Sequence, residues 1–473
     1  MSELEQKIEA RLKKPFFTEM LTMAYVTGAN HSDYLETVKK WAVHFRGILQ
    51  DRNLIKKIKH RPKDFWNFKG KKTIYNIDGG QLSLAITGAA TMGVRVGVYK
   101  VKPGDYSKER EDYDDSSLLT SNLVDMTGDS HFDEDDEYEV DFKKMLESSR
   151  MIMEVAEVIK QTEGKGKWED KPKEKDLIFL HGPILFEAAM YHLTSDANDK
   201  FPPFKKEFCD SILKHKPNFI LREFKDWRKE DDNYLRTFIP LYCEIANYLK
   251  RSKIPTYGVV ERSVNKAPGA VSRAMIGELY GTRVRKIQME RRNFDSSWNT
   301  KKAGHAQKGE EIEKVFKSYV LGDPYLFDLI LDEGEYIQPI QVLKQNPFKW
   351  PMISGKGYFE KFFNFMPEPY VTYLKTSEFR KPIRVETLNI LESFDDDLDF
   401  IFHSAKMLPQ YAFPLGLDTV DKLAKVPNWM RNSLKNAYQM RMLRALINTG
   451  NKDYIELGLK SLIPNRNGFN RPK

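Results

Sequence analysis

The sequence predicts an α/β protein in which a mixed sheet is flanked by helices, with helical extensions at the N- and C-terminal ends. Short runs of β-branched and aromatic residues, typical of strands, alternate with longer runs whose apolar residues recur at helical spacing. Polar residues also stand at the ends of several predicted strands, where α/β proteins gather their binding sites. A chain of 473 residues is long enough for more than one domain.

Composition narrows the class of protein. Hydrophobic residues make up 41% of the chain, and no apolar run approaches the ~18–20 residues that span a bilayer. The first residues carry acids and no apolar core, so they do not form a secretory signal. Cys209 and Cys243 match no zinc spacing and no disulfide framework. We therefore expect a cytoplasmic, globular protein.

The charge is unevenly distributed. The formal net charge of +8 mildly favours binding to polyanionic partners. Residues from about 104 to 141 are strongly acidic, so the rest of the chain is more basic than the total indicates. We interpret this segment as a loop or insertion, and both a solvated loop and a DNA mimic that blocks a channel are compatible with its composition.

The predicted elements follow one another along the chain. Apolar residues at helical spacing predict helices, and alternating or continuous β-branched runs predict strands. In the first half these are a helix at 34–58, paired strands at 73–77 and 85–101, a helix at 141–161 and a strand at 176–180. In the second half they are helices at 238–250 and 312–320, strands at 256–260, 370–374 and 383–388, and helical residues at 432–462.

The sequence Asp78-Gly79-Gly80 follows the first predicted strand. We interpret it as a strand that ends on a carboxylate and turns at once, because glycine adopts backbone angles closed to other residues. A carboxylate held rigidly at a strand tip can be the first ligand of a metal-dependent nuclease. Asp-Gly is also a common hairpin turn, so the motif needs further residues beside it.

Two later elements supply such residues. Arg150 and Glu154 are four residues apart and therefore share one face of the helix predicted at 141–161. The strand predicted at 176–180 runs into His181. The structural alternatives are a surface ion pair worth at most ~0.5 kcal/mol for Glu154 and a hydrogen-bonded strand-end histidine for His181.

The order of these elements resembles that of the NurA nucleases. Those proteins have a strand followed by Asp-Gly, a helix with Arg-x-x-x-Glu, and a strand that ends in a metal ligand and glycine. The resemblance covers roughly residues 71–434, and the order of the blocks carries it. The further blocks resemble those of the family at residues 255–263, 323–335, 370–375, 382–386 and 411–426.

The resemblance implies an RNase H-like (PIWI-like) core, a nuclease that cuts DNA with Mn²⁺ or Mg²⁺, a homodimer, and a partner of the HerA-type hexameric ATPase class. It also implies three regions. These are an N-terminal helical region at 1–70, the nuclease domain at 71–434, and C-terminal helices with a basic tail at 435–473.

The metal site of the family uses Asp, Glu, Asp and a late His. Asp78 and Glu154 match the first two positions, whereas the third is His181 and the fourth is Asp421. The two departures are reciprocal, so we hypothesise that the ligand set is preserved with two positions exchanged. The alternative is a decayed site in which Asp421 is an ordinary surface acid. Asp323 is an outer candidate for the metal.

We expect the two cations of such a site to be bridged by Asp78, with Glu154 holding one of them. His181 and Asp421 would complete the second position, or one of them would orient the attacking water. Carboxylates suit Mg²⁺ and Mn²⁺, and an imidazole tilts the preference toward Mn²⁺.

Basic residues interleaved with aromatics predict a path for DNA, because they neutralise phosphates and stack on bases. A solvated surface loop is the alternative. The candidates are Arg262, Lys266, Arg273, Arg283, Arg285, Arg291, Arg292, Lys301 and Lys302.

Two other functions remain open at this stage. One is a catalytically silent subunit that scaffolds or caps an ATPase ring, and the other is an unrelated hydrolase such as a glycosidase with paired carboxylates. Repair of DNA ends and defence against phage are both compatible with a nuclease that works beside a motor.

Overall fold

The structure, a computed structural model, divides the chain into two compact units. The smaller unit contains Met1–Lys57, Val264–Gln338 and Tyr373–Pro382, and the larger contains Ile58–Ser263, Pro339–Thr372 and Ile383–Lys473. The residues described are 15–59, 72–86, 89–105, 107–119, 124–125, 150–151, 153–162, 167–168, 172–174, 176–184, 246–261, 269–280, 300–319, 321–342, 367–408 and 410–462.

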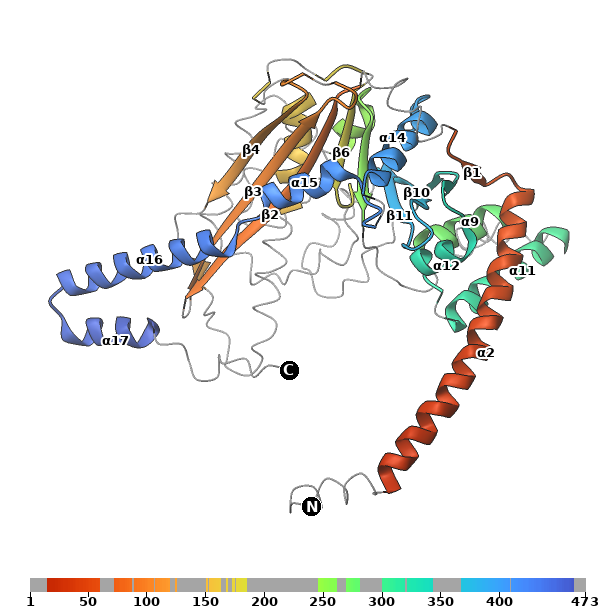
Figure 1. Ribbon diagram of the computed structural model, residues 1–473, viewed down its shortest axis with the longest axis horizontal. Helices are drawn as coiled ribbons and strands as arrows, with labels where there is room; N and C mark the ends of the chain where they lie inside the picture. Colours follow the sequence, from red (N-terminus) through yellow and green to blue (C-terminus); the bar gives the residue numbers. More distant parts are fainter. Residues whose placement is uncertain are drawn as a thin grey trace. The chain divides into compact units, whose positions relative to one another are not determined.

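The larger unit is built on a mixed sheet with the strand order β10-β11-β7-β6-β2-β3-β4 (Figure 1). β2, β3 and β4 are successive antiparallel strands, and β6 and β7 then add parallel to β2 on its other side. The strands are β2 (Ile74–Ile86), β3 (Ala89–Val101), β4 (Glu111–Leu119), β5 (Val124–Asp125), β6 (Leu177–His181), β7 (Thr256–Val260), β9 (Ile340–Gln341), β10 (Tyr370–Leu374) and β11 (Ile383–Thr387). The predicted α/β fold, a mixed sheet flanked by helices, is confirmed.

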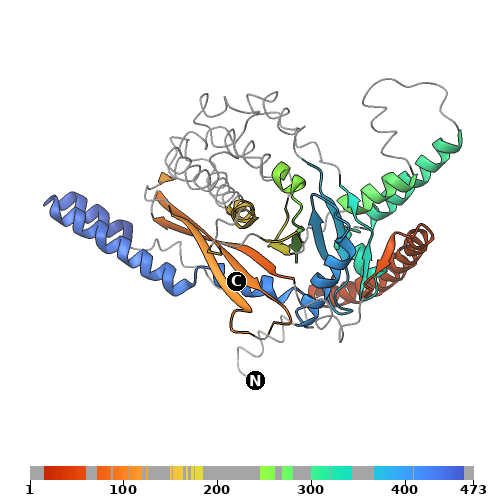
Figure 2. The ribbon, with the colours of Figure 1, turned by 90° about the horizontal axis from the view of Figure 1, so that it is seen from above.

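Helices cover both faces of this sheet. Residues 150–151 and 153–162 are helical and lie on one face of β2 and β3, and α15 (Leu415–Ala424) lies on the other (Figure 2, yellow and blue). The remaining helices of the larger unit are α14 (Phe394–Lys406), α16 (Asn428–Asn448) and α17 (Lys452–Leu462). Between these layers the central strands are buried almost completely, and β6 reads Leu-Ile-Phe-Leu because both of its faces are covered.

The smaller unit packs helices around a short strand pair. β1 (Ile55–Lys57) pairs antiparallel with β8 (Glu335–Ile337), and Leu374 at the end of β10 pairs with Tyr336. The helices are α2 (Pro15–Asp51), α9 (Ala270–Tyr280), α11 (Thr300–Ser318) and α12 (Asp323–Ile330). Among the described residues, no helix combines the length and the hydropathy needed to cross a membrane.

One expected helix differs in its bounds, and the C-terminal helical residues agree with the structure. The helix expected at 34–58 begins earlier and ends at Asp51, because Asn53 takes a left-handed φ of 55° and the backbone N–H of Leu54 turns back to the carbonyl of Leu49. The helical residues expected at 432–462 are confirmed. They form two helices, which are separated near Gly450 with its φ of 67°.

The acidic segment is not wholly a loop, because Glu111–Leu119 forms the edge strand β4. Its acids are matched by bases: Asp112 pairs with Lys167 at 2.7 Å and Asp115 pairs with Arg95 at 3.0 Å. The hydrogen bond from Lys167 is the main cause that lowers the pKa of Asp112 to about 2. A charged edge strand also resists pairing with the edge of another sheet. The rest of the segment, apart from Val124–Asp125, lies largely outside the described residues.

Candidate metal centre at the end of the parallel strands

Asp78 and His181 occupy equivalent places on neighbouring parallel strands. The β2–β6 ladder runs from Ile74 opposite Leu177 to Ile77 opposite Leu180, and the next residues along the two strands are Asp78 and His181. Because carboxyl ends of parallel strands meet at one edge, both side chains emerge together at the end of the ladder. Polar residues predicted at strand ends are thus brought side by side by the register of the sheet.

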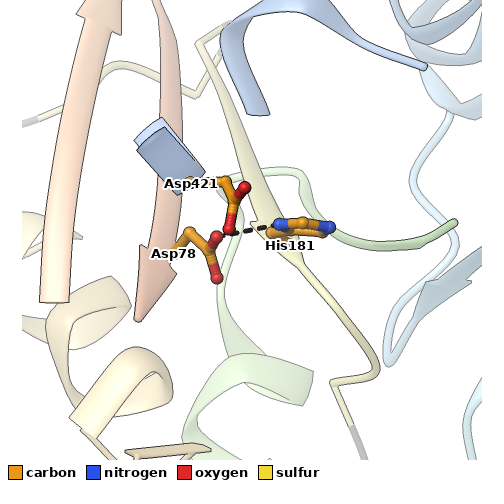
Figure 3. Close-up of side chains that lie close together, drawn as sticks. All are labelled: Asp78, His181 and Asp421. Carbon is orange, nitrogen blue, oxygen red and sulfur yellow. Dashed lines mark hydrogen bonds and ion pairs between the residues drawn. The ribbon is translucent and has the colours of Figure 1, made fainter. Parts of the chain in front are cut away.

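The two side chains form a hydrogen bond. Nδ1 of His181 and Oδ2 of Asp78 lie 2.8 Å apart (Figure 3). The other oxygen of Asp78 accepts a hydrogen bond of 2.8 Å from the backbone N–H of Gly79, so the carboxylate is held at both ends. The side chain of Asp78 is 4% exposed whereas that of His181 is 21% exposed, so the pair opens to solvent on the histidine side.

Asp421 completes a group of three. It lies on α15, and one ligand atom each from Asp78, His181 and Asp421 falls within 4.8 Å of the others. Figure 3 shows the three side chains converging from β2, β6 and α15. Asp421 also forms an ion pair with Lys425, the residue that caps the C-terminal end of α15.

The donor set suits a small divalent cation. An ion bound at about 2.0–2.6 Å by its ligands holds ligand atoms that are at most roughly 4–5 Å apart. The ligand atoms of this group all lie within 4.8 Å of one another, so they fall inside that limit. Two carboxylates and one imidazole are ligands that Mn²⁺ and Mg²⁺ accept, with the nitrogen favouring Mn²⁺. The residues therefore fit the kind of cation that the sequence predicts.

The surroundings favour a positive charge beside these acids. Burial acts to lower the pKa of His181, but the hydrogen bond and charge of Asp78 outweigh it, helped by the charges of Asp421 and Glu154. The net result is a raised pKa for His181. A cation bound by both Asp78 and His181 would replace the proton that they share.

Glu154 lies close by but is joined to Asp78 through Arg150. Arg150 forms an ion pair with Glu154, and its Nη1 lies 3.9 Å from Oδ1 of Asp78. Burial is the largest cause that raises the pKa of Glu154, to about 8, against the opposing charge of Arg150. Glu154 is 2% exposed, so the surface ion pair considered from the sequence is wrong and the pair is an internal one. The guanidinium supplies the positive charge between the two carboxylates.

The strand does not turn at Gly79 and Gly80, which corrects the sequence interpretation. β2 continues to Ile86, with Gly79 opposite Val96 and Gly80 opposite Arg95. The glycines instead admit close neighbours on opposite faces. A Cβ on Gly79 would lie 2.5 Å from Oε1 of Glu154, and a Cβ on Gly80 would lie 2.9 Å from the carbonyl carbon of Ala424. The motif therefore lets the Glu154 helix and α15 approach Asp78 from both sides.

Glu386 is a site residue that sequence reasoning missed. Its Oε2 accepts a hydrogen bond of 3.0 Å from the backbone N–H of Ile184, three residues after His181. Its other oxygen pairs with Arg384, as expected for alternating residues of one strand. Gly258 permits the same loop to approach, since a Cβ there would lie 2.7 Å from the carbonyl oxygen of Gly182. The loop that follows His181 is therefore fixed by β7 and β11.

Asp323 has a different set of contacts. It belongs to the smaller unit, where its oxygens accept hydrogen bonds from the backbone N–H groups of Val271 at 2.8 Å and Ser272 at 2.9 Å. N–H groups in the first turn of a helix have no acceptor within the helix, so the Asp323 carboxylate supplies one and stabilises the start of α9.

Few of the predicted DNA-binding residues lie in the described part of the chain. Arg273 is exposed on α9, and Lys301 and Lys302 are part of α11. The other candidates lie outside the described residues, namely Arg262, Lys266, Arg283, Arg285, Arg291 and Arg292.

Comparison with known proteins finds similarity in solved structures. A scan against protein-family models and a search of curated proteins gave no match. The fold is similar to the NurA nuclease from Sulfolobus solfataricus, with a TM-score of 0.47 and 10% identity over 91% of this chain and 98% of that one. It is similar to a NurA structure bound to dAMP and manganese, with a TM-score of 0.40 and 11% identity over 86% and 94% of the two chains.

A third solved structure, NurA with manganese, has a TM-score of 0.35 and 13% identity over 89% of this chain and 99% of that one. These similarities span most of each chain, and at 10–13% identity they concern the fold.

Proposed function

We propose that this protein is a metal-dependent deoxyribonuclease of the NurA type. The observation that carries the proposal is the convergence of Asp78, His181 and Asp421, with ligand atoms within 4.8 Å of one another. Two of these three positions depart from the family pattern in sequence, yet the side chains meet at one point. A decayed site gives no reason for this reciprocal replacement to preserve a ligand set.

The proposed cofactor is Mn²⁺ or Mg²⁺. When bound, such a cation polarises the phosphodiester and lowers the pKa of water. Asp78 would hold the cation from within β2, at the end of its parallel ladder with β6, and His181 and Asp421 would complete the ligands from β6 and α15. Glu154 is the proposed fourth residue of the site. Arg150, whose side chain is 27% exposed beside these acids, is placed to stabilise charge on a phosphate.

The proposed substrate is DNA, held through its phosphates by the basic residues predicted from the sequence. Such contacts carry no sequence preference and weaken steeply as salt rises. We further propose a homodimer that works in the cytoplasm with a HerA-type hexameric ATPase, either in DNA end processing or in defence against phage. The sequence resemblance supports this partner.

The test is cleavage of linear and circular DNA in Mn²⁺ by the full chain, with and without a HerA-type ATPase. We expect Asp78→Asn, His181→Ala and Asp421→Asn to lower cleavage by at least ~100-fold, a loss of about 2.7 kcal/mol or more in transition-state stabilisation. Asp418→Asn is the matched control, because Asp418 pairs with Lys422 on α15 just as Asp421 pairs with Lys425.

The two outcomes separate the proposed function from its alternative. Loss of cleavage in the three site variants, with activity kept in Asp418→Asn, supports the nuclease. If the wild-type chain binds the ATPase and is folded but cuts no DNA in any divalent cation, the protein is instead the catalytically silent subunit.

A further inference from the structure

Two aromatic rings lead outward from His181. The ring of Phe413 lies 5.1 Å from that of His181 between centroids, and the ring of Tyr411 lies 6.0 Å from that of Phe413 at nearly a right angle. Phe413 is fully buried, whereas Tyr411 is 36% exposed. The row therefore begins at a candidate metal ligand and ends at an aromatic side chain that reaches solvent.

The backbone holds this row in place. Ala412, between the two aromatic residues, has a left-handed φ of 57° and is 2% exposed. The N–H groups of Tyr411 and Ala412 both donate to the carbonyl of Leu408, at 3.0 and 2.8 Å. A buried alanine in this conformation persists only where its surroundings fix it, and such residues concentrate at functional sites. Here it gives Tyr411 and Phe413 their orientation.

Tyr411 is the member of this row that a ligand can reach, because Phe413 is fully buried. The site opens to solvent nearby through the side chains of His181 and Asp421, each 21% exposed. An aromatic platform beside the opening of a nuclease site is suited to a nucleobase.

We propose that Tyr411 is a positioning residue, which stacks on a base of the DNA close to the phosphate that is cleaved. The inference rests on the proposed nuclease function and adds a residue to that site. Every base presents a π-face, so stacking orients the strand without selecting a sequence. The bases of single-stranded DNA expose this face, so single-stranded DNA is the probe used to test the contact.

The experiment uses single-stranded oligonucleotides that carry 2-aminopurine at successive positions from one end, because its fluorescence is quenched when it stacks. The full chain is mixed with each oligonucleotide in EDTA, so that no cleavage occurs. We expect quenching of at least twofold at one position with the wild-type protein and with Tyr411→Phe. We expect none at that position with Tyr411→Leu and Tyr411→Met, which keep an apolar side chain but no ring.

Cleavage in Mn²⁺ gives a second readout. We expect the KM for single-stranded DNA to rise about tenfold in Tyr411→Leu and Tyr411→Met, and to stay near the wild-type value in Tyr411→Phe. Binding of Mn²⁺, followed by electron paramagnetic resonance, must stay unchanged in all three variants, since Tyr411 is not a ligand. A variant that loses Mn²⁺ binding points to a structural role for the ring and overturns the inference.

Failure of this inference and failure of the nuclease are distinguishable. Cleavage by the wild-type protein without quenching at any position, or equal quenching in Tyr411→Leu, overturns the stacking role and leaves the nuclease standing. A wild-type protein that cleaves no DNA overturns both.

Discussion

Asp78 and His181 are joined by a hydrogen bond of 2.8 Å because each is the first residue beyond the end of one parallel ladder. The register of β2 and β6, from Ile74 opposite Leu177 to Ile77 opposite Leu180, fixes this relationship before any side chain is considered. A shift of one residue would turn one of the two side chains to the other face of the sheet. The buried apolar residues of the two strands therefore set the geometry of the site.

The first prediction concerns the exchange of His181 and Asp421. If both face one cation, the double variant His181→Asp with Asp421→His restores the family's order of ligands with the same atoms available. We expect each single variant to bind Mn²⁺ at least ~30-fold more weakly, a change of about 2 kcal/mol, and the double variant to recover most of that loss. Titration calorimetry with Mn²⁺ measures all four proteins.

The same titrations contain their own control. The coupling between the two positions is the difference between the double variant and the sum of the two single variants. Additive losses would show that the two residues do not share a cation, and the reciprocal-exchange hypothesis would then be abandoned.

The sequence predicts this site in part, for a physical reason. Continuous apolar runs flanked by polar residues locate β2, β6 and β7, and strand ends in α/β proteins meet at one edge. Asp78 and His181 therefore follow from local sequence. Asp421 follows from the order of blocks that resembles the family, since nothing near it in the sequence marks a ligand.

What the sequence does not predict depends on distant neighbours. In a sequence, a glycine needed for a turn cannot be told from a glycine needed for a close contact. At Gly79 and Gly80 the contact explains the glycine, because Glu154 and Ala424 lie against these two positions in the structure. From the sequence, Glu386 is expected only to pair with Arg384. The structure adds a hydrogen bond from the backbone N–H of Ile184, which lies 202 residues earlier in the chain. The spacing of Arg150 and Glu154 predicts their contact but not their burial.

The second prediction contrasts Gly79→Ala with Gly80→Ala. A Cβ on Gly79 meets flexible side chains of Glu154 and Arg150, whereas one on Gly80 meets the backbone of α15 at Ala424. Backbone atoms of a packed helix move less easily than the ends of side chains. We therefore expect Gly80→Ala to lower the unfolding free energy by ~1–3 kcal/mol and Gly79→Ala to lower it by less. Urea unfolding followed by circular dichroism measures both.

The matched control for these variants is Gly47→Ala, where a new Cβ has nothing within 4 Å and the residue lies inside α2. We expect it to be neutral or to stabilise by up to ~1 kcal/mol. Equal losses in Gly79→Ala and Gly80→Ala would mean that the approach of α15 does not depend on Gly80.

The third prediction concerns Arg150. Its guanidinium would compete with a bound cation, because Nη1 lies 3.9 Å from Oδ1 of Asp78. Removing this charge in Arg150→Met is expected to raise the affinity for Mn²⁺ by roughly tenfold. Cleavage is nevertheless expected to fall, because the group proposed to stabilise charge on the phosphate is lost.

Arg150→Lys keeps the charge and serves as the comparison. It should bind Mn²⁺ close to the wild-type level and retain more cleavage than Arg150→Met. A metal affinity that is the same in Arg150→Met and the wild-type protein would show that Arg150 does not act on the cation site.

The fourth prediction concerns a buried acid away from the site. Asp397 is fully buried and accepts hydrogen bonds from Lys72 at 2.8 Å, Tyr257 at 2.8 Å and Ser393 at 2.7 Å. Asp397→Asn leaves the Lys72 ammonium without its partner, so we expect a loss of ~3–5 kcal/mol in urea unfolding. Asp395→Asn, which breaks the exposed pair with Lys59 at 3.6 Å, should cost no more than ~1 kcal/mol. Similar losses in the two variants would show that the buried network adds no stability.

The last prediction concerns the alkaline limit of stability. Burial, followed by the charge of Asp397 and the hydrogen bond to it, raises the pKa of Tyr257 well above its usual value near 10. Above pH 10 the unfolded chain therefore releases this proton while the folded protein retains it, so stability falls as pH rises. Tyr257→Phe removes that dependence. It should be less stable than the wild-type protein by ~0.5–1.5 kcal/mol at pH 8, because one hydrogen bond to Asp397 is lost. The difference should shrink between pH 10 and pH 11 in urea unfolding, and a difference that stays constant over this range would show that Tyr257 ionises alike in the folded and unfolded states.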